Sequence, residues 1–252
     1  MFRWLTIKNL PQKQIGILRQ PTNTRPIIRL VEDNGVQEVV KDFSVNGFIY
    51  RNLIGRFLLW RESCVYQRLE GIKGIPAFYR KISGLALVVS KAPGKDLEHL
   101  SEVESLNLEF FQKLIRLIQK CYRHGVAHCD LKRSSNILID ECGNPHLIDW
   151  AATILEREFF LYPFTIIYKK FIDDDFKAVI KLKMRYCPQE ITDEEKRNYP
   201  HRVFGERTIR AVRDAGRRWL QKIAWNSYIG IFFKWAMLIM LYNRKILFYN
   251  KI

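Results

Sequence analysis

The 252-residue sequence lacks internal repeats, low-complexity tracts and a Cys-x-x-Cys pair. Its five cysteines are an odd number, which argues against the paired disulfide framework of a small secreted protein. The first residues, MFRWLTIKNLPQKQIG, do not form the continuous apolar run of a signal peptide. We therefore expect a protein of the reducing cytoplasm.

The composition supplies a hydrophobic core and a large excess of positive charge. With 48% hydrophobic and 27% charged residues, the chain is globular, with one substantial domain or two small ones. The net charge is +16, and residues 160–252 hold 19 Lys and Arg against 9 Asp and Glu, or +10 of that excess. A basic surface favours anionic partners such as nucleotides, acidic lipids or acidic proteins. Nucleic acid also fits this charge, but we do not favour it.

The local patterns predict an α+β chain with a β-rich first third. Three prolines make residues 1–25 irregular in this interpretation. Asn34-Gly35 between two β-rich runs predicts a hairpin, and Ser83-Gly84 predicts a second one. The other expected elements are a helix over 52–70, a helix over 106–122, strands over 136–140 and 146–149, and mostly helix afterwards, with a capping box from Thr192 to Glu195.

The stretch from 128 to 150, HCDLKRSSNILIDECGNPHLIDW, contains the residue types that phosphoryl transfer requires. That reaction needs magnesium ligands, a cation on the phosphates and a carboxylate beside the acceptor hydroxyl. Asp130 can orient and deprotonate the hydroxyl, and Lys132 can reach the transferring phosphoryl group. Asn136 and Asp149 can hold the metal.

The same stretch resembles the protein-kinase superfamily. HCDLKRSSN is similar to the catalytic loop H-R-D-L-x-x-x-N, and IDW stands where D-F-G is expected. Upstream, VVK resembles the lysine strand V-A-I-K, with Val39 and Lys41 on one face, and Glu62 is the expected ion-pair partner of Lys41. The resemblance implies a two-lobed protein-kinase-like fold, with a minimal β-rich N-lobe and a helical C-lobe, that uses ATP and Mg²⁺. Lys41, Glu62 and Val39 would then contact or support the nucleotide.

The sequence departs from the kinase pattern within the catalytic loop. Asn136 comes one residue late, whereas the 13 residues from Asn136 to Asp149 fit the usual hairpin. The extra residue therefore lies in LKRSS, and a bulged loop is the economical explanation, with Ser135 as the fallback metal ligand. Cys129 replaces the arginine that reads a phosphorylated activation segment, which argues against control of that kind. Trp150 replaces the phenylalanine of D-F-G, which makes a mobile switch there less expected.

No G-x-G-x-x-G motif precedes the lysine strand. The phosphates must then be covered by another loop, around Gly16 or within residues 19–26. These departures resemble the atypical branch, which comprises RIO-type kinases and bacterial lipopolysaccharide sugar kinases. The resemblance covers about residues 27–155.

Zinc binding is an alternative for part of this region, but the candidate Cys and His ligands do not have the paired Cys-x₂-Cys spacing of zinc knuckles. The candidate ligands would be Cys121, His124, His128, Cys129, Cys142 and His146. We interpret His128 as a structural support of the catalytic loop.

The C-terminal part combines a basic amphipathic helix over 207–222 with an apolar segment over 224–242. The first is either a solvated basic face or a dock for an anionic membrane or polyanionic substrate. Lys234 near the middle of the second favours a packed or membrane-surface helix over a spanning one. We divide the chain into an N-lobe (1–91), a C-lobe (92–203) and a tail (204–252) that can associate peripherally with the inner face of a membrane.

Three acceptor classes follow from the kinase interpretation. Lys132, two residues after Asp130, favours a serine or threonine side chain of a protein as the acceptor. The minimal first lobe and basic tail suit an anionic glycolipid, the acceptor of a lipopolysaccharide sugar (Kdo or heptose) kinase. A small-molecule kinase of the aminoglycoside type ranks last, because cationic drugs require an acidic site. A pseudokinase or basic binding module is the non-enzymatic alternative, and the retained Lys41, Glu62, Asp130, Asn136 and Asp149 argue against it.

Overall fold

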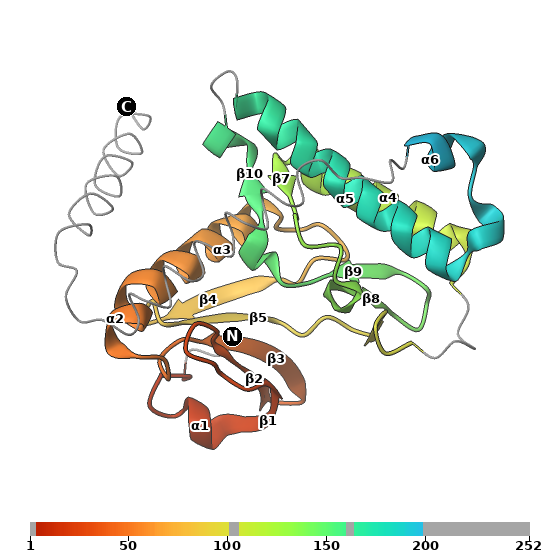
Figure 1. The fold of residues 1–252 in the computed structure, drawn as a ribbon. Coiled ribbons are helices and arrows are strands. Elements are labelled where there is room, and N and C mark those ends of the chain that lie inside the picture. Colours follow the sequence, from red (N-terminus) through yellow and green to blue (C-terminus); the bar gives the residue numbers. More distant parts are fainter. Residues whose placement is uncertain (1–3, 101–105, 160–163, 199–252) are drawn as a thin grey trace.

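A computed structural model of the chain describes residues 4–100, 106–159 and 164–198 (Figure 1). The predicted basic helix over 207–222 and the apolar segment over 224–242 lie outside the described residues. None of the helices within the described ranges is long and apolar enough to cross a membrane.

A five-stranded antiparallel sheet forms the first part of the molecule, in the order β1-β2-β3-β5-β4. Both predicted hairpins are confirmed. Asn34 and Gly35 turn between β2 and β3 with φ of 52° and 78°, which suits the residue types found there. The strands are β1 (Gln14–Arg19), β2 (Ile27–Asp33), β3 (Val36–Asp42), β4 (Phe78–Ile82) and β5 (Ala86–Ser90).

The prediction that residues 1–25 are irregular is wrong. A one-turn helix, α1 (Leu10–Lys13), leads directly into β1, and Pro11 fits because a proline is tolerated in the first turn of a helix. Leu5 and Leu10 are fully buried against the outer face of the sheet, beside Val31 and Val40. The N-terminal segment is therefore ordered by covering that face, a long-range contact that local patterns do not reveal.

A long helical segment packs against the inner face of the sheet (Figure 1). It begins at Phe48, four residues before the predicted start, and its α-helical and π-helical parts run without a break. Glu62 lies on its buried side together with Leu59 and Val65. The parts are α2 (Phe48–Tyr50), η1 (Arg51–Gly55) and α3 (Arg56–Arg68).

The chain leaves the sheet through a short connection after β5. Gly94 in this connection has φ of 92°, and a Cβ there would lie 2.0 Å from the carbonyl oxygen of Ile139, so the close approach of the two backbones requires glycine. The next strand, β6 (Lys95–Asp96), pairs with the hairpin of β8 (Ile137–Ile139) and β9 (Pro145–Leu147). The predicted strands over 136–140 and 146–149 are thereby confirmed, each somewhat shorter than expected.

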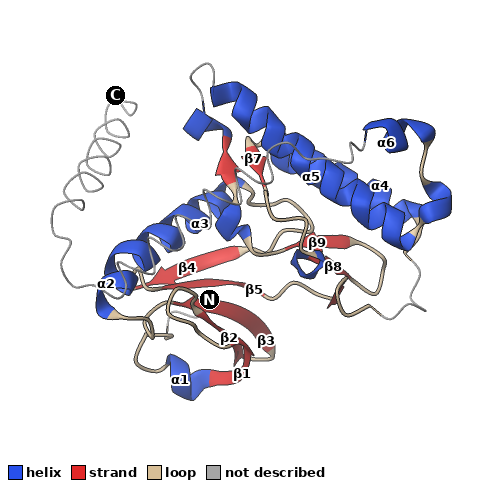
Figure 2. Ribbon diagram, in the orientation of Figure 1, coloured by secondary structure: helices blue, strands red, loops and turns tan. Residues whose placement is uncertain are grey.

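Helices dominate the rest of the described chain (Figure 2). Thr192 and Glu195 form the predicted capping box: the Thr192 amide donates to the Glu195 carboxylate at 2.9 Å, and the Glu195 amide donates to the Thr192 hydroxyl at 3.2 Å. The helices are α4 (Leu108–Arg123), α5 (Phe164–Tyr186) and α6 (Asp193–Asn198). Shorter elements are β7 (Val126–Ala127), η2 (Ser134–Asn136), η3 (Trp150–Ala152), β10 (Ile154–Leu155), η4 (Glu156–Phe159) and η5 (Pro188–Glu190).

One large hydrophobic cluster joins the sheet to the helices. It includes Leu87 of β5, Leu59 of α3, Phe111 of α4, Trp150 and Val179 of α5, all buried. The predicted boundary between residues 91 and 92 falls in the connection between β5 and β6, and this core extends on both sides of it. The division of the chain into 1–91, 92–203 and 204–252 stays a prediction.

Candidate active site

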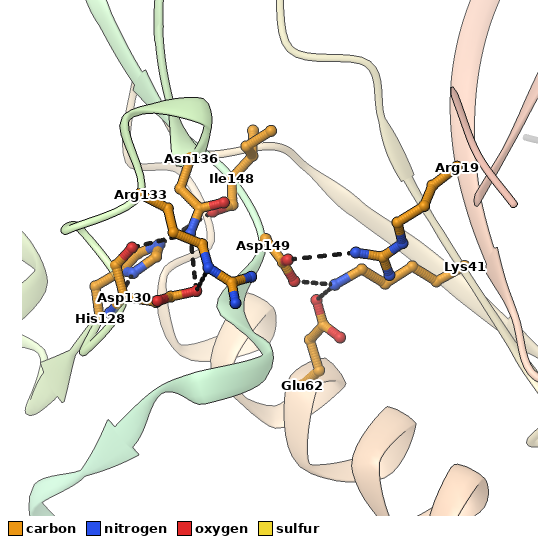
Figure 3. A network of polar contacts seen from close by, with 9 residues as sticks. All are labelled: Arg19, Lys41, Glu62, His128, Asp130, Arg133, Asn136, Ile148 and Asp149. Atoms are coloured by element: carbon orange, nitrogen blue, oxygen red, sulfur yellow. Dashed lines mark hydrogen bonds and ion pairs between the residues drawn. The ribbon is translucent and has the colours of Figure 1, made fainter. Parts of the chain in front are cut away.

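Lys41 lies near the end of β3, paired across the strand with Ile28 and Leu87. Its ammonium nitrogen lies 2.6 Å from Glu62 Oε1 on α3 and 2.6 Å from Asp149 Oδ1 (Figure 3). The alternation of a strand places Val39 on the same face, and Val39 packs half-buried against the main core. Three predicted site residues that are far apart in the sequence therefore meet at one ammonium group.

The two carboxylates and the ammonium shift one another's protonation. Burial favours the neutral amine of Lys41, but Asp149 and Glu62 outweigh it, and the pKa of Lys41 lies above its usual value. The charge of Lys41 holds the pKa of Asp149 well below its usual value against the effect of burial. Burial raises the pKa of Glu62, while Lys41 opposes that rise. The cluster thus keeps a charged cation and a charged carboxylate together in a largely buried site.

Asp149 follows β9 in a left-handed conformation with φ of 62°, which is uncommon for a residue with a side chain. The residue before it, Ile148, is held by contacts of both its backbone amide and its backbone carbonyl. The Ile148 amide donates to the Asn136 carbonyl at 3.0 Å, and the Ile148 carbonyl lies 3.0 Å from His128 Nε2. The backbone before Asp149 is therefore tied to both ends of the predicted catalytic loop.

His128 is buried and acts as a support, as predicted from the sequence. Its ring packs on that of Trp150 with the centroids 4.6 Å apart. Burial lowers the pKa of His128 to about 4, so the ring is neutral near pH 7. Trp150 itself is fully buried, which fits the expectation that the segment after Asp149 is held in place.

Asn136 reaches Asp130 in spite of the extra residue between them. Its side-chain amide donates to the Asp130 carbonyl at 2.9 Å and to the Asp130 carboxylate at 3.2 Å. The short 3₁₀ helix η2 ends at Asn136 and tightens the chain just before it, which takes up the additional residue. Ser135, the fallback, is not needed for this contact.

Asp175 on α5 anchors the same loop, and the sequence analysis missed it. Its carboxylate accepts the backbone amides of His128 at 2.8 Å and Cys129 at 2.9 Å, and the Tyr122 hydroxyl lies 3.2 Å away. Cys129 has φ of 65°, so these bonds hold a strained backbone next to Asp130. Burial raises the pKa of Asp175 to about 7, although the amide donors oppose the rise.

A sequence signal for Asp175 exists. It shares a helical stripe, at spacings of three and four residues, with Ala178, Val179 and Leu182, which are all buried. An acidic residue on the apolar face of a helix has to find donors inside the protein, because an unpaired buried carboxylate is costly.

Three basic side chains complete the surroundings. Arg133 Nε lies 3.4 Å from Asp130 Oδ2, and Arg19 Nη1 lies 3.9 Å from Asp149 Oδ2 (Figure 3). Arg133 was not predicted, and Arg19 entered the prediction only as part of the segment 19–26 that could cover the phosphates. Lys132 is exposed on the loop that carries Asp130.

The oxygens of Asn136 and Asp149 suit a magnesium ion. Because the Asn136 amide nitrogen faces Asp130, its carbonyl oxygen remains as a donor to a metal, and Mg²⁺ prefers such oxygen ligands. The zinc alternative finds no support within the described residues, where no three His, Cys, Asp or Glu side chains gather around one point.

No protein-family model matches the sequence. No curated protein is detectably similar to it in sequence. Among solved structures, the Rio2 kinase from Chaetomium thermophilum is similar, with a TM-score of 0.52 and 19% identity over 76% of this chain and 65% of the kinase. A complex of that kinase with ADP, Mg²⁺ and phosphoaspartate gives a TM-score of 0.53 and 17% identity over 85% of this chain and 74% of the kinase.

These similarities show the fold. The chain has the two-lobed α+β fold of an atypical protein kinase and spans about two thirds of the first of these structures. The predicted fold class is thereby confirmed, and the predicted resemblance to the atypical kinases is confirmed at the level of the fold. The resemblance to lipopolysaccharide sugar kinases stays a prediction.

Proposed function

We propose that the protein is a Mg-ATP-dependent phosphotransferase that moves the γ-phosphate to a hydroxyl group, with protein Ser/Thr as the favoured acceptor. One observation supports this above all: the Lys41 ammonium lies 2.6 Å from both Glu62 and Asp149. A lysine held by a helical glutamate beside a metal-binding aspartate is what a kinase needs before it can bind ATP productively. The similar Rio2 complex holds ADP and Mg²⁺, which supports the same cofactors here.

Each side chain has one role in this proposal. Lys41, oriented by Glu62, binds the nucleotide phosphates, and Val39 on the same face lines the nucleotide site. Asn136 and Asp149 hold Mg²⁺, which neutralises charge on the phosphates when bound. In this proposal Lys41, Val39, Asn136 and Asp149 together position the nucleotide.

The acceptor side rests on the loop after β7. The Asp130 carboxylate, oriented by Asn136, accepts the proton of the acceptor hydroxyl. The hydroxyl oxygen then bonds to the γ-phosphorus as the bond from that phosphorus to the bridging oxygen breaks and ADP leaves. Lys132 reaches the transferred phosphoryl group and stabilises its charge.

A lipopolysaccharide sugar kinase is the second candidate, and Arg133 favours it. This half-exposed arginine lies 3.4 Å from the Asp130 carboxylate and adds a cation where the acceptor would bind. An anionic glycolipid would use that charge, and a neutral serine side chain would not. Peripheral attachment to the inner face of a membrane through residues 204–252 belongs to this candidate and is supported by the composition of the tail.

Purified full-length protein with ATP labelled at the γ-phosphate and Mg²⁺ tests the proposal. The protein itself, a generic basic protein and lipid A precursors are offered in parallel, with Lys41→Met as the inactive control. We expect label on protein Ser or Thr. Label on the glycolipid alone would replace the first candidate by the second, and no transfer to any acceptor would contradict both.

A further inference from the structure

The connection between β1 and β2, residues 20–26, belongs to a segment that the sequence analysis expects to cover the nucleotide phosphates. Several of its carbonyl groups accept hydrogen bonds from residues that follow β3. The Asn46 side-chain amide donates to the carbonyls of Thr22 at 2.7 Å and Arg25 at 3.1 Å. The Tyr50 hydroxyl donates to the carbonyl of Thr24 at 2.9 Å. Residues that follow β3 therefore fix this turn, and Asn46 is itself buried.

Four of the seven positions in the connection, residues 20–26, offer no free backbone amide. Pro21 and Pro26 have no N–H group. The Thr22 amide donates to the Arg25 carbonyl at 3.2 Å, and the Arg25 amide donates to the Thr22 carbonyl at 3.3 Å. A glycine-rich loop binds phosphate through successive free amides that face the anion. In residues 20–26 the prolines and the two paired amides leave no run of more than two successive amides, those of Asn23 and Thr24, to face a phosphate.

Arg19, the last residue of β1, has the hydrogen-bonding capacity that the turn lacks. Its Nη1 lies 3.9 Å from Asp149 Oδ2, which is too long for a hydrogen bond, while Lys41 holds the other oxygen of Asp149 at 2.6 Å. Among the described residues, its buried Nε has no hydrogen-bond partner. A buried donor left unpaired costs free energy, so a site that keeps one is suited to a ligand.

We propose that Arg19 binds the polyphosphate of the nucleotide and replaces the backbone amides of a glycine-rich loop. The inference rests on the proposed function, because it concerns the same ATP site. A guanidinium presents parallel N–H groups that match two oxygens of one phosphate, and it carries a full charge. With Lys41 it places two cations around Asp149, where the phosphates and the metal would meet.

Gly16 is the competing candidate for close contact with the phosphates. It lies inside β1 without a positive φ, although the pairing with β2 shifts register there, and a Cβ would meet no atom of the protein within 4 Å. The protein itself therefore does not require glycine at this position, and Gly16→Ala is a control that tests the competing candidate directly.

Calorimetric binding of ATP, ADP, AMP and adenosine to the full-length protein with Mg²⁺ tests the inference. Arg19→Ala should weaken ATP binding about tenfold or more, because the phosphates lose a charge-assisted hydrogen-bond donor, and should leave adenosine binding unchanged. Arg19→Lys should restore part of the loss. Gly16→Ala and Arg116→Ala, an exposed arginine on α4, should bind ATP within about twofold of the unaltered protein.

The outcomes separate the two proposals. If the unaltered protein binds ATP and Arg19→Ala binds it equally well, Arg19 has no such role and the phosphotransferase proposal stands. If Arg19→Ala weakens adenosine and ATP to the same extent, the residue is structural and the inference is wrong. If the unaltered protein binds no nucleotide, the proposed function and the inference both fail.

Discussion

The side-chain amide of Asn136 donates to both the carbonyl and the carboxylate of Asp130, at 2.9 and 3.2 Å, across a loop that is one residue longer than the kinase pattern. The pairing fixes the Asp130 carboxylate and leaves the Asn136 carbonyl oxygen for a metal. The additional residue is therefore accommodated within η2, and the two proposed site residues still meet.

Replacing Asn136 by alanine should lower the phosphotransfer rate at least about tenfold, because it removes a metal ligand and the group that orients Asp130. Steady-state rates across a Mg²⁺ titration measure both effects, and the variant should need more Mg²⁺. Ser135→Ala, next to it in the chain, should behave like the unaltered protein. A larger loss in Ser135→Ala than in Asn136→Ala would make Ser135 the ligand.

Lys41→Met should lower the free energy of unfolding by about 3 kcal/mol, because the buried carboxylate of Glu62 and the partly buried carboxylate of Asp149 lose their cation. The double variant Lys41→Met/Glu62→Gln should lose less than the sum of the single variants, by about 1 kcal/mol. Urea denaturation of the four proteins measures this coupling. The exposed pair Glu109 and Lys113 on α4 is the matched control and should show no coupling. Additive losses at Lys41 and Glu62 would contradict the buried pairing.

His128 and Asp175 should give stability opposite dependences on pH. The pKa of His128 is lowered to about 4, so between pH 4 and 6.5 the unfolded chain binds its proton more tightly and stability rises with pH. The pKa of Asp175 is raised to about 7, so from about pH 4 to 7 the folded chain binds its proton more tightly and stability falls with pH. In the unaltered protein the two contributions largely cancel.

Single substitutions should expose each contribution. Relative to the unaltered protein, His128→Gln should lose about 1.4 kcal/mol of stability for each unit that the pH rises between 4 and 6.5, and Asp175→Asn should gain about as much. Denaturation at several pH values gives both slopes. Parallel profiles for all three proteins would show that neither group titrates as the structure indicates.

The segment after Asp149 is held by an ion pair. Arg61 on α3 donates to both oxygens of Glu158, at 3.1 and 2.7 Å, and the Leu155 amide donates to the same carboxylate at 3.1 Å. Glu158→Gln should slow phosphotransfer about fivefold, equivalent to about 1 kcal/mol. The reason is that the ion pair links the segment after Asp149 to α3, the helix that also carries Glu62. Glu156→Gln, in the same short helix, is the control and should have no effect.

Because a fixed carboxylate holds this segment and Cys129 replaces the phosphate-reading arginine, phosphatase treatment should leave the rate unchanged. A comparison of treated and untreated protein in the same assay measures this. A large loss of activity after treatment would show that a phosphate, and not Glu158, orders the segment.

Much of the site could be predicted because its residues lie at ends of strongly patterned elements. Asn34-Gly35 predicted the β2–β3 hairpin that places Lys41, and the 13-residue spacing from Asn136 to Asp149 predicted the β8–β9 hairpin. Both signals are local, and turn chemistry with strand alternation decides them.

What the sequence analysis missed depends on contacts between distant segments. In β1, the large apolar residues Ile15, Ile17 and Leu18 are all exposed, so their pattern marks no buried face, and only pairing with β2 makes the segment a strand. Arg19 could not be placed without that strand. Asp175 contacts its loop from 46 and 47 positions away, and no local motif connects the two.

The measurement that tests the central claim most directly is phosphotransfer by Asp130→Asn beside the unaltered protein, with ATP affinity measured on the same samples. The proposed role of Asp130 predicts that transfer falls at least about a hundredfold while ATP binds equally well, because the carboxylate acts on the acceptor proton and not on the nucleotide. Full activity in Asp130→Asn would contradict it.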